Sequence, residues 1–169
     1  MTETIKVIIP AYNEETSIGK VIKDLPTFVD EIIVVNNNST DATAKNALEA
    51  GATVLSEQIP GYGNACLKGI EYIQQQKTGT DIVVFLDGDY SDYPEELTKI
   101  VAPIIENNID FVLGSRIKKF REKGAMQPQQ IIGNWLATFL MRLFFKSKFT
   151  DLGPFRAIKF DTLIGLKMK

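Results

Sequence analysis

Four short segments of the sequence are almost continuously apolar and rich in isoleucine and valine. They are residues 5–10 (IKVIIP), 31–36 (EIIVVN), 81–87 (DIVVFLD) and 110–115 (DFVLGS). Strands of a parallel sheet that is covered by helices on both faces lack the polar alternation of half-exposed strands and form such continuous runs. The segments therefore predict a buried, mostly parallel sheet, and this constrains the fold more than any other feature.

The segments between these runs have the spacing of helices. Residues 18–25 place apolar side chains on one helical face, and residues 42–50 form a second candidate helix that Gly51 would end. Residues 53–55 predict a short extra strand. This alternation implies right-handed crossovers and a three-layer α/β/α arrangement, with an open, mostly parallel, Rossmann-like sheet. A length of 169 residues predicts a single domain over residues 1–169.

Polar residues follow each of the four strong runs directly. They are residues 12–15 (YNEE), 36–39 (NNNS), 87–89 (DGD) and 115–116 (SR). Loops are polar in most proteins, so one such cluster would mean little. In an open α/β sheet, however, ligands bind beyond the carboxyl ends of the strands. Four clusters at this edge therefore predict a binding site there.

The amino-acid composition excludes several kinds of chemistry. The chain has no histidine and a single cysteine, Cys66. Ser-His-Asp and Cys-His catalysis, zinc clusters and an intramolecular disulfide are therefore ruled out. A net charge of -2 provides no basic field for nucleic acid. Acids, bases and metal ligands must come mainly from Asp, Glu, Lys and Tyr.

The tripeptide Asp87-Gly88-Asp89 is the candidate metal site. It follows the apolar run VVFL and would place two carboxylates on a tight turn at the working edge of the sheet. Mg²⁺ and Mn²⁺ accept one or two protein carboxylates and complete their shell with water and phosphate oxygens. The tripeptide alone is a common turn, but its position after a strand predicts Mg²⁺ or Mn²⁺ together with a nucleotide diphosphate.

Several ordered motifs together resemble family 2 glycosyltransferases with the GT-A fold of nucleotide-diphospho-sugar transferases. They are residues 10–15 (PAYNEE), 32–41 (IIVVNNNSTD), 85–97 (FLDGDYSDYPEEL) and 114–116 (GSR). Residues 150–158 (TDLGPFRAI) resemble the late acceptor-side motif of the dolichyl- or polyprenyl-phosphate mannose and glucose synthases. The match runs in order over most of the chain.

This resemblance implies a role for each residue that matches a family motif. Asp87 and Asp89 would bind the metal, and Asp89, Arg116 and Asp151 would be catalytic. Arg116 would neutralise a phosphate, and Asp151 would be the base for a hydroxyl acceptor or would only orient the turn at residues 150–156. Arg156 would bind an acceptor phosphate. The nucleotide-sugar site would comprise Pro10, Ala11, Tyr12, Glu14, Asn36, Asn38, Gly63, Asp87, Gly88, Asp89 and Arg116.

The implied reaction is metal-assisted transfer of a hexose, with inversion, from a UDP- or GDP-sugar to an acceptor such as a polyprenyl phosphate. A phosphate acceptor is already ionised at neutral pH and needs no general base. The absence of histidine is therefore no obstacle to this reaction.

Two positions depart from the family pattern. Asn36 and Asn37 stand where the family usually has Asp, and an amide oxygen accepts a hydrogen bond but carries no charge. The identity of the base is left open for this reason. Ser91 stands where the mannose-synthase relatives usually have Gln. Its hydroxyl could reach the metal, or Ser91 or Asp92 could cap the helix that opens at residues 94–96.

Residues 61–65 (GYGNA) predict a glycine turn that opens a helix. The turn either lies beside a phosphate of the donor or has no ligand at all. The turn could be mistaken for a dinucleotide-binding motif, but it lacks the third glycine of that motif and does not follow the first strand, which disfavours a dinucleotide site.

Residues 118–129 predict a mobile loop, and residues 130–146 are apolar around most of a helix. That helix would lie at a membrane interface near a lipid acceptor, or be buried in a homodimer or against the sheet. The N-terminus lacks the features of a signal peptide. We expect a cytoplasmic protein, or one held peripherally at the inner face of the membrane.

Two alternatives come from other functional classes. A sugar-phosphate nucleotidyltransferase shares the sheet, but it normally has a glycine-rich, basic loop after its first strand, where this chain has PAYNEE. A non-catalytic nucleotide-sugar binding module is the second alternative. The sequence also ends at residues 166–169 (LKMK) without an obvious terminal element, and a catalytic domain truncated at its C-terminus is one interpretation.

Overall fold

The computed structural model describes residues 3–76, 79–114 and 153–168. The chain divides into two units, Met1–Val112 together with Phe155–Lys169, and Leu113–Pro154. Almost all of the second unit lies outside the described residues. The single domain expected over residues 1–169 stays a prediction.

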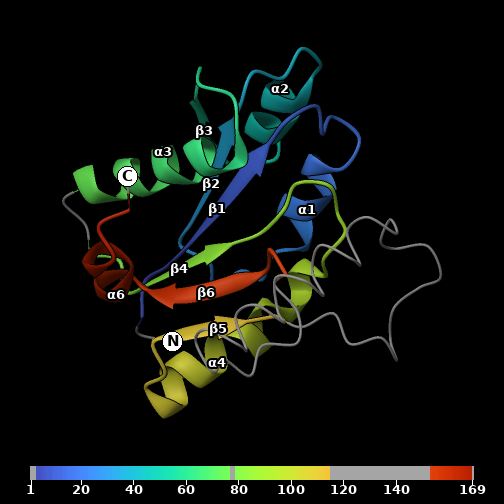
Figure 1. Ribbon diagram of the computed structural model, residues 1–169. Coiled ribbons are helices and arrows are strands. Elements are labelled where there is room, and N and C mark those ends of the chain that lie inside the picture. Colours follow the sequence, from blue (N-terminus) through green and yellow to red (C-terminus); the bar gives the residue numbers. More distant parts are fainter. Residues whose placement is uncertain (1–2, 77–78, 115–152, 169) are drawn as a thin grey trace, which may run out of the picture. The chain divides into compact units, whose positions relative to one another are not determined.

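A mixed, mostly parallel sheet forms the centre of the first unit (Figure 1). Its strand order is β3-β2-β1-β4-β6-β5. Neighbours among the first four strands pair in parallel, and β6 pairs antiparallel with β4. The strands are β1 (Ile5–Ala11), β2 (Glu31–Asn36), β3 (Thr53–Ser56), β4 (Ile82–Phe85), β5 (Phe111–Leu113) and β6 (Arg156–Lys159).

The helices cover the sheet on both faces, as the sequence predicts. They are α1 (Ile18–Asp24), α2 (Thr43–Glu49), α3 (Tyr62–Gln75), η1 (Pro94–Glu96), α4 (Leu97–Asn107) and α6 (Phe160–Gly165). Gly51 follows α2 with a φ of +97°, a conformation that suits glycine at the end of a helix. The N-cap position of η1 is Tyr93, not Ser91 or Asp92.

The core consists of two apolar clusters, one on each face of the sheet. The alternation of side chains along β1 shows the division, because Val7 and Ile9 belong to one cluster and Ile8 to the other. The first cluster packs under α1, α2 and α4, and the second under α3 and α6. All seven residues of β1 are buried, as a strand covered on both faces requires.

Helix α3 lies very close to β1 at Gly69. A Cβ atom at this position would stand 2.8 Å from Cγ2 of Ile8, whose side chain is fully buried. The helix can approach the strand this closely only because Gly69 has no side chain.

A polar cluster lies between α3 and the amino ends of the first strands. We call it the Glu31 cluster: Glu31 accepts hydrogen bonds from Lys6 at 3.0 Å, Tyr72 at 2.9 Å and Gln76 at 3.0 Å. Thr53 donates a fourth at 3.1 Å. These contacts offset the cost of burying Lys6, which is 4% exposed.

Strand β6 was not expected from the sequence. It is only four residues long, and its two charged ends, Arg156 and Lys159, break the apolar pattern by which the other strands are recognised. Its middle residues, Ala157 and Ile158, are buried between β4 and β5. The strand places Arg156 opposite Phe85, at the carboxyl end of β4.

Within the described part of the chain, none of the helices has the length and apolar character to cross a bilayer. The predicted loop at residues 118–129 and the predicted helix at residues 130–146 lie outside the described residues.

Candidate nucleotide-sugar site

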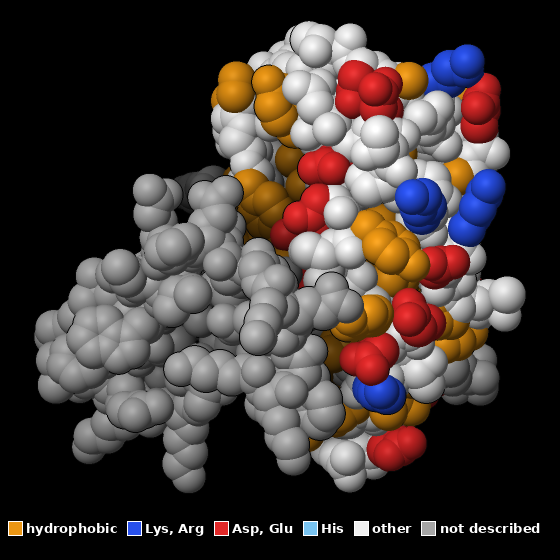
Figure 2. All heavy atoms as spheres, turned by 90° about the vertical axis from the view of Figure 1, so that its right-hand side faces the viewer, with side chains coloured by type: hydrophobic (Ala, Val, Ile, Leu, Met, Phe, Trp, Pro, Cys, Tyr) orange, Lys and Arg blue, Asp and Glu red, His pale blue; other side chains and the backbone are white. Residues whose placement is uncertain are grey.

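The carboxyl ends of β1, β2 and β4 meet at one edge of the sheet, since these strands are parallel and adjacent. This edge lies at the right of Figure 1 and faces the viewer in Figure 2. Figure 2 shows a hollow on this face where acidic and hydrophobic side chains meet. The loops that follow the three strands bring the predicted polar clusters together there.

A cavity of about 220 Å³ opens at this edge. It brings together two sequence-predicted segments: the loop after β1 and the acidic turn after β4. The first turn of α3 and the loop after β2 complete its wall. The lining residues are Pro10, Ala11, Tyr12, Glu14, Asn37, Tyr62, Ala65, Asp87, Gly88 and Asp89.

The acidic turn Asp87-Gly88-Asp89 begins two residues after β4 ends. Asp87 is half-buried, and Asp89 is exposed. The Oδ1 atom of Asp89 accepts the backbone N–H of Ser91 at 2.9 Å, which fixes the turn from within. Gly88 is buried, and a Cβ atom there would lie 3.4 Å from Cγ of Glu14. The turn and the loop after β1 are therefore in close contact.

Glu14 is held in place by several hydrogen bonds. Its backbone N–H donates to Oγ1 of Thr43 at 2.7 Å, and its Oε2 accepts the Ser17 hydroxyl at 3.0 Å. Burial raises the pKa of Glu14, and the charges of Asp89 and Asp41 raise it further, while the bond from Ser17 lowers it. Glu14 and the acidic turn therefore bring carboxyl groups to the same cavity.

The three consecutive asparagines after β2 have different roles. Asn37 lines the cavity, and its amide ties two loops together: it donates to the carbonyls of Glu57 at 3.0 Å and Ile59 at 2.8 Å and accepts the N–H of Gly61 at 2.7 Å. Asn36 and Asn38, two of the residues predicted for the nucleotide-sugar site, are not among the lining residues. Their amides bind Ser39 N–H and the Gln58 carbonyl instead.

Sequence reasoning did not select Asn37, Tyr62 or Ala65 as site residues, yet all three line the cavity. In the sequence, Asn37 stands out only as a departure from the family pattern. Tyr62 and Ala65 belong to the predicted glycine turn, in which Gly63 is the predicted site residue. Gly63 lies in the first turn of α3 but is not among the lining residues. One helical turn separates Tyr62 from Cys66, so both face the same region.

Arg156 lies close to this wall of the cavity. Its guanidinium carbon stands 5.5 Å from the centre of the Phe85 ring, a cation–π geometry. Burial and the charge of Asp87 raise the pKa of Tyr62, while Arg156 acts in the opposite direction. Burial raises the pKa of Cys66 to about 11, again against the effect of Arg156. The Cys66 thiol is therefore protonated at neutral pH and is not a nucleophile.

The remaining predicted site residues, Arg116 and Asp151, lie outside the described residues, as does Ser115.

The acidic turn has the chemistry that a hard divalent cation requires. Within residues 3–76, 79–114 and 153–168, no three His, Cys, Asp or Glu side chains form a group that could hold a metal by themselves. Asp87 and Asp89 nevertheless line one cavity. A cation bound by one or two carboxylates and completed by phosphate oxygens fits this arrangement.

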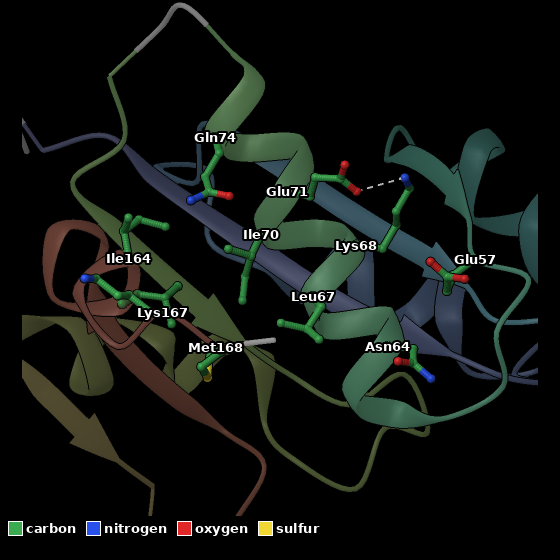
Figure 3. Close-up of a pocket in the computed structure, with 11 residues that line it drawn as sticks. Glu57, Asn64, Leu67, Lys68, Ile70, Glu71, Gln74, Ile164, Lys167 and Met168 are labelled. Carbon is green, nitrogen blue, oxygen red and sulfur yellow. Dashed lines mark hydrogen bonds and ion pairs between the residues drawn. The ribbon is translucent and has the colours of Figure 1, made fainter.

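A second hollow, of about 330 Å³, lies between α3 and α6 (Figure 3). It shares no lining residue with the cavity at the strand ends. Apolar side chains such as Ile70 and Met168 alternate with charged ones, and Lys68 and Glu71 pair with each other at 3.0 Å. None of the sequence-predicted site residues lies here.

Several known proteins are similar to this chain in sequence and in architecture. Residues 6–165 match the model of the family described as "Glycosyl transferase family 2". Protein RfbJ of Shigella flexneri is 39% identical over 114 residues, which cover 66% of this chain and 84% of that protein. The UDP-N-acetylglucosamine–dolichyl-phosphate N-acetylglucosaminyltransferase of Methanococcus voltae is 32% identical over 155 residues, covering 80% of this chain and 61% of that protein.

Among solved structures, glucosyl-3-phosphoglycerate synthase from Mycobacterium tuberculosis superposes with a TM-score of 0.75 at 27% identity. The match covers 96% of this chain and 58% of the synthase, whose crystal structure holds Mn²⁺, UDP-glucose and phosphoglyceric acid. The chain thus spans somewhat more than half the length of the synthase and of the Methanococcus enzyme. The predicted GT-A fold is confirmed, and the chain belongs to glycosyl transferase family 2.

Proposed function

We propose that the cavity at the strand ends binds a nucleotide-diphosphate sugar together with a divalent cation, and that the protein transfers the hexose to an acceptor. One observation carries this proposal: the loop after β1 and the acidic turn after β4 line the same cavity. Membership of glycosyl transferase family 2 supports transfer of a sugar rather than of a nucleotide, and so disfavours the nucleotidyltransferase alternative.

The nucleoside would lie against the end of β1 and the loop that follows it, where Pro10, Ala11 and Tyr12 line the cavity. Asn37 would hold the neighbouring wall in place through its bonds to the loop before α3. We propose UDP as the nucleotide, because the Methanococcus relative is named for a UDP-sugar and the synthase structure holds UDP-glucose. GDP is the alternative to be tested beside it.

Asp87 and Asp89 would hold the cation, Mn²⁺ or Mg²⁺, against the diphosphate. When bound, such a cation neutralises the charge that develops on the departing nucleotide diphosphate. The chain's own contribution is positional: the bond between Asp89 and the Ser91 N–H keeps one carboxylate in place, and buried Gly88 lets the turn pack against Glu14. Arg116 is proposed to act on the same diphosphate.

We propose a polyprenyl phosphate as the acceptor, because the Methanococcus relative is named for a dolichyl phosphate. The chain has no histidine, and an ionised phosphate oxygen can attack without a general base. Arg156 is proposed to attract the acceptor phosphate, and attack on the side opposite the leaving diphosphate would invert the sugar. For a hydroxyl acceptor, Asp151 would be the base.

A transfer assay tests this proposal. UDP- and GDP-hexoses with Mn²⁺ are offered with a polyprenyl phosphate or with the matching polyprenol, and release of the nucleotide diphosphate is measured. We expect release with one of the two nucleotides and only with the phosphate acceptor, and inversion in the product by NMR. Equal rates with the polyprenol would contradict the acceptor, and no release with any donor would contradict the reaction.

A polyprenyl phosphate resides in a bilayer, so the proposal also predicts that the protein binds vesicles containing it. Co-sedimentation with vesicles that carry or lack the acceptor measures this association.

A further inference from the structure

Tyr90, which follows the acidic turn directly, has a left-handed backbone with a φ of +62°. A bulky side chain is unfavourable in this region, where glycine and asparagine are usually found. Other contacts must therefore hold Tyr90 in place.

The Tyr90 side chain makes such a contact with a distant element. Its hydroxyl donates a hydrogen bond to Oδ2 of Asp24, the last residue of α1, although the two residues are 66 positions apart. In Figure 1 the loop after β4 passes beside α1. The backbone on the other side of Tyr90 is fixed by the bond from Ser91 N–H to Asp89 at 2.9 Å.

Helix α1, which provides Asp24, is held in place by its packing against the core. Its side chains Ile18, Val21 and Ile22 are buried in the core. Its first residue, Ile18, donates its N–H to the Glu14 carbonyl at 2.9 Å, and its Cδ1 would lie 3.5 Å from a Cβ at Gly88. The helix therefore touches the acidic turn at its start and the residue after that turn at its end.

We propose that Tyr90 is a positioning residue, which holds Asp87 and Asp89 ready for the cation and the diphosphate through its bond to Asp24. This inference rests on the proposed function. Tyr90 is not among the residues that line the cavity, so it acts through the turn rather than by touching the donor. Without the bond, the left-handed residue would relax and the two carboxylates would occupy a wider range of positions.

The first test compares Tyr90→Phe with Tyr93→Phe by calorimetric titration of UDP and GDP, with and without Mn²⁺. Tyr93 is a matched control: it lies in the same loop, is 57% exposed, and its hydroxyl has no hydrogen bond among the described residues. We expect Tyr90→Phe to weaken Mn²⁺-dependent binding about two- to tenfold, the loss expected for one such bond. Metal-free binding should be unchanged, and Tyr93→Phe should behave as the wild type.

The partner residue offers a second test. Asp24→Ala removes the acceptor and should cause the same loss, whereas Asp24→Asn keeps an acceptor oxygen and should restore most of the affinity. The double variant of Tyr90→Phe and Asp24→Ala should bind no more weakly than either single variant, because both remove one interaction. Asp24→Ala removes a negative charge from a helix C-terminus, so no loss of helix stability is expected from it.

Hydrogen exchange of the free protein provides a readout that does not need the metal. The amides of residues 88–92 should exchange faster in Tyr90→Phe and in Asp24→Ala than in Tyr93→Phe. Wild-type exchange and wild-type Mn²⁺-dependent affinity in Tyr90→Phe would overturn this inference and leave the proposed function standing. A wild-type protein that binds neither nucleotide with Mn²⁺ would instead overturn the proposed function.

Discussion

Replacing Gly69 by alanine should destabilise the protein, because α3 packs against β1 at this glycine. The new Cβ would lie 2.8 Å from Cγ2, 3.0 Å from Cδ1 and 3.1 Å from Cγ1 of Ile8. Overpacking of this kind costs about 1–3 kcal/mol, and the better helix propensity of alanine returns about 1 kcal/mol. The net loss should therefore reach up to about 2 kcal/mol, which lowers the Tm of a domain of this size by up to about 8 °C.

Gly19→Ala is the matched control, since Gly19 is also helical but has nothing within 4 Å of the position of its Cβ. This variant should gain up to about 1 kcal/mol. Urea denaturation at 25 °C measures both changes. A Gly69→Ala variant as stable as Gly19→Ala would refute the reasoning, because it would mean that the helix moves away from the strand without cost.

Three further changes have defined outcomes. Asp89→Asn should abolish the Mn²⁺-dependent part of nucleotide binding and change the Tm by no more than about 1 °C. Asp161→Asn on α6 is the control, and unchanged metal dependence of binding in Asp89→Asn, measured by calorimetry, would count against the metal site. Hydrogen bonds within the Glu31 cluster outweigh burial and lower the pKa of Glu31. The stability that this carboxylate contributes is therefore present above pH 4.5 and is lost as the pH falls below it. In Glu31→Gln, the free energy of unfolding should consequently fall less steeply than in the wild type as the pH is lowered below 4.5. Asn37→Ala should cost about 2–4 kcal/mol in urea denaturation, because it removes three hydrogen bonds to the backbone of residues 57–61.

The fold was largely predictable because its strands are covered on both faces. Continuous runs of isoleucine and valine identify β1, β2 and β4, and the glycine at position 51 marks the end of α2. Strand β6 could not be recognised, since four residues with charged ends have no periodicity to detect. Its antiparallel insertion beside β4 is determined by packing between segments that are far apart in sequence.

The candidate site was predictable where residues follow strands directly. The pairing of the strands in the sheet fixes where such residues lie, and for this reason the cavity is lined by Tyr12, Glu14, Asp87 and Asp89. The contribution of Asn37 depends on a loop that returns to it more than twenty residues later, and sequence spacing does not reveal such a contact. The same holds for the bond from Tyr90 to α1.

Thermal stabilisation by nucleotides tests the central claim most directly. UDP, GDP, CDP and ADP are each added with and without Mn²⁺, and Tm is recorded. At one hundred times its Kd, a ligand adds about 2.7 kcal/mol, or about 5–10 °C for a chain of this length. The proposed site predicts that one diphosphate, expected to be UDP, raises Tm only when Mn²⁺ is present. No shift with any diphosphate, or equal shifts without the metal, would contradict it.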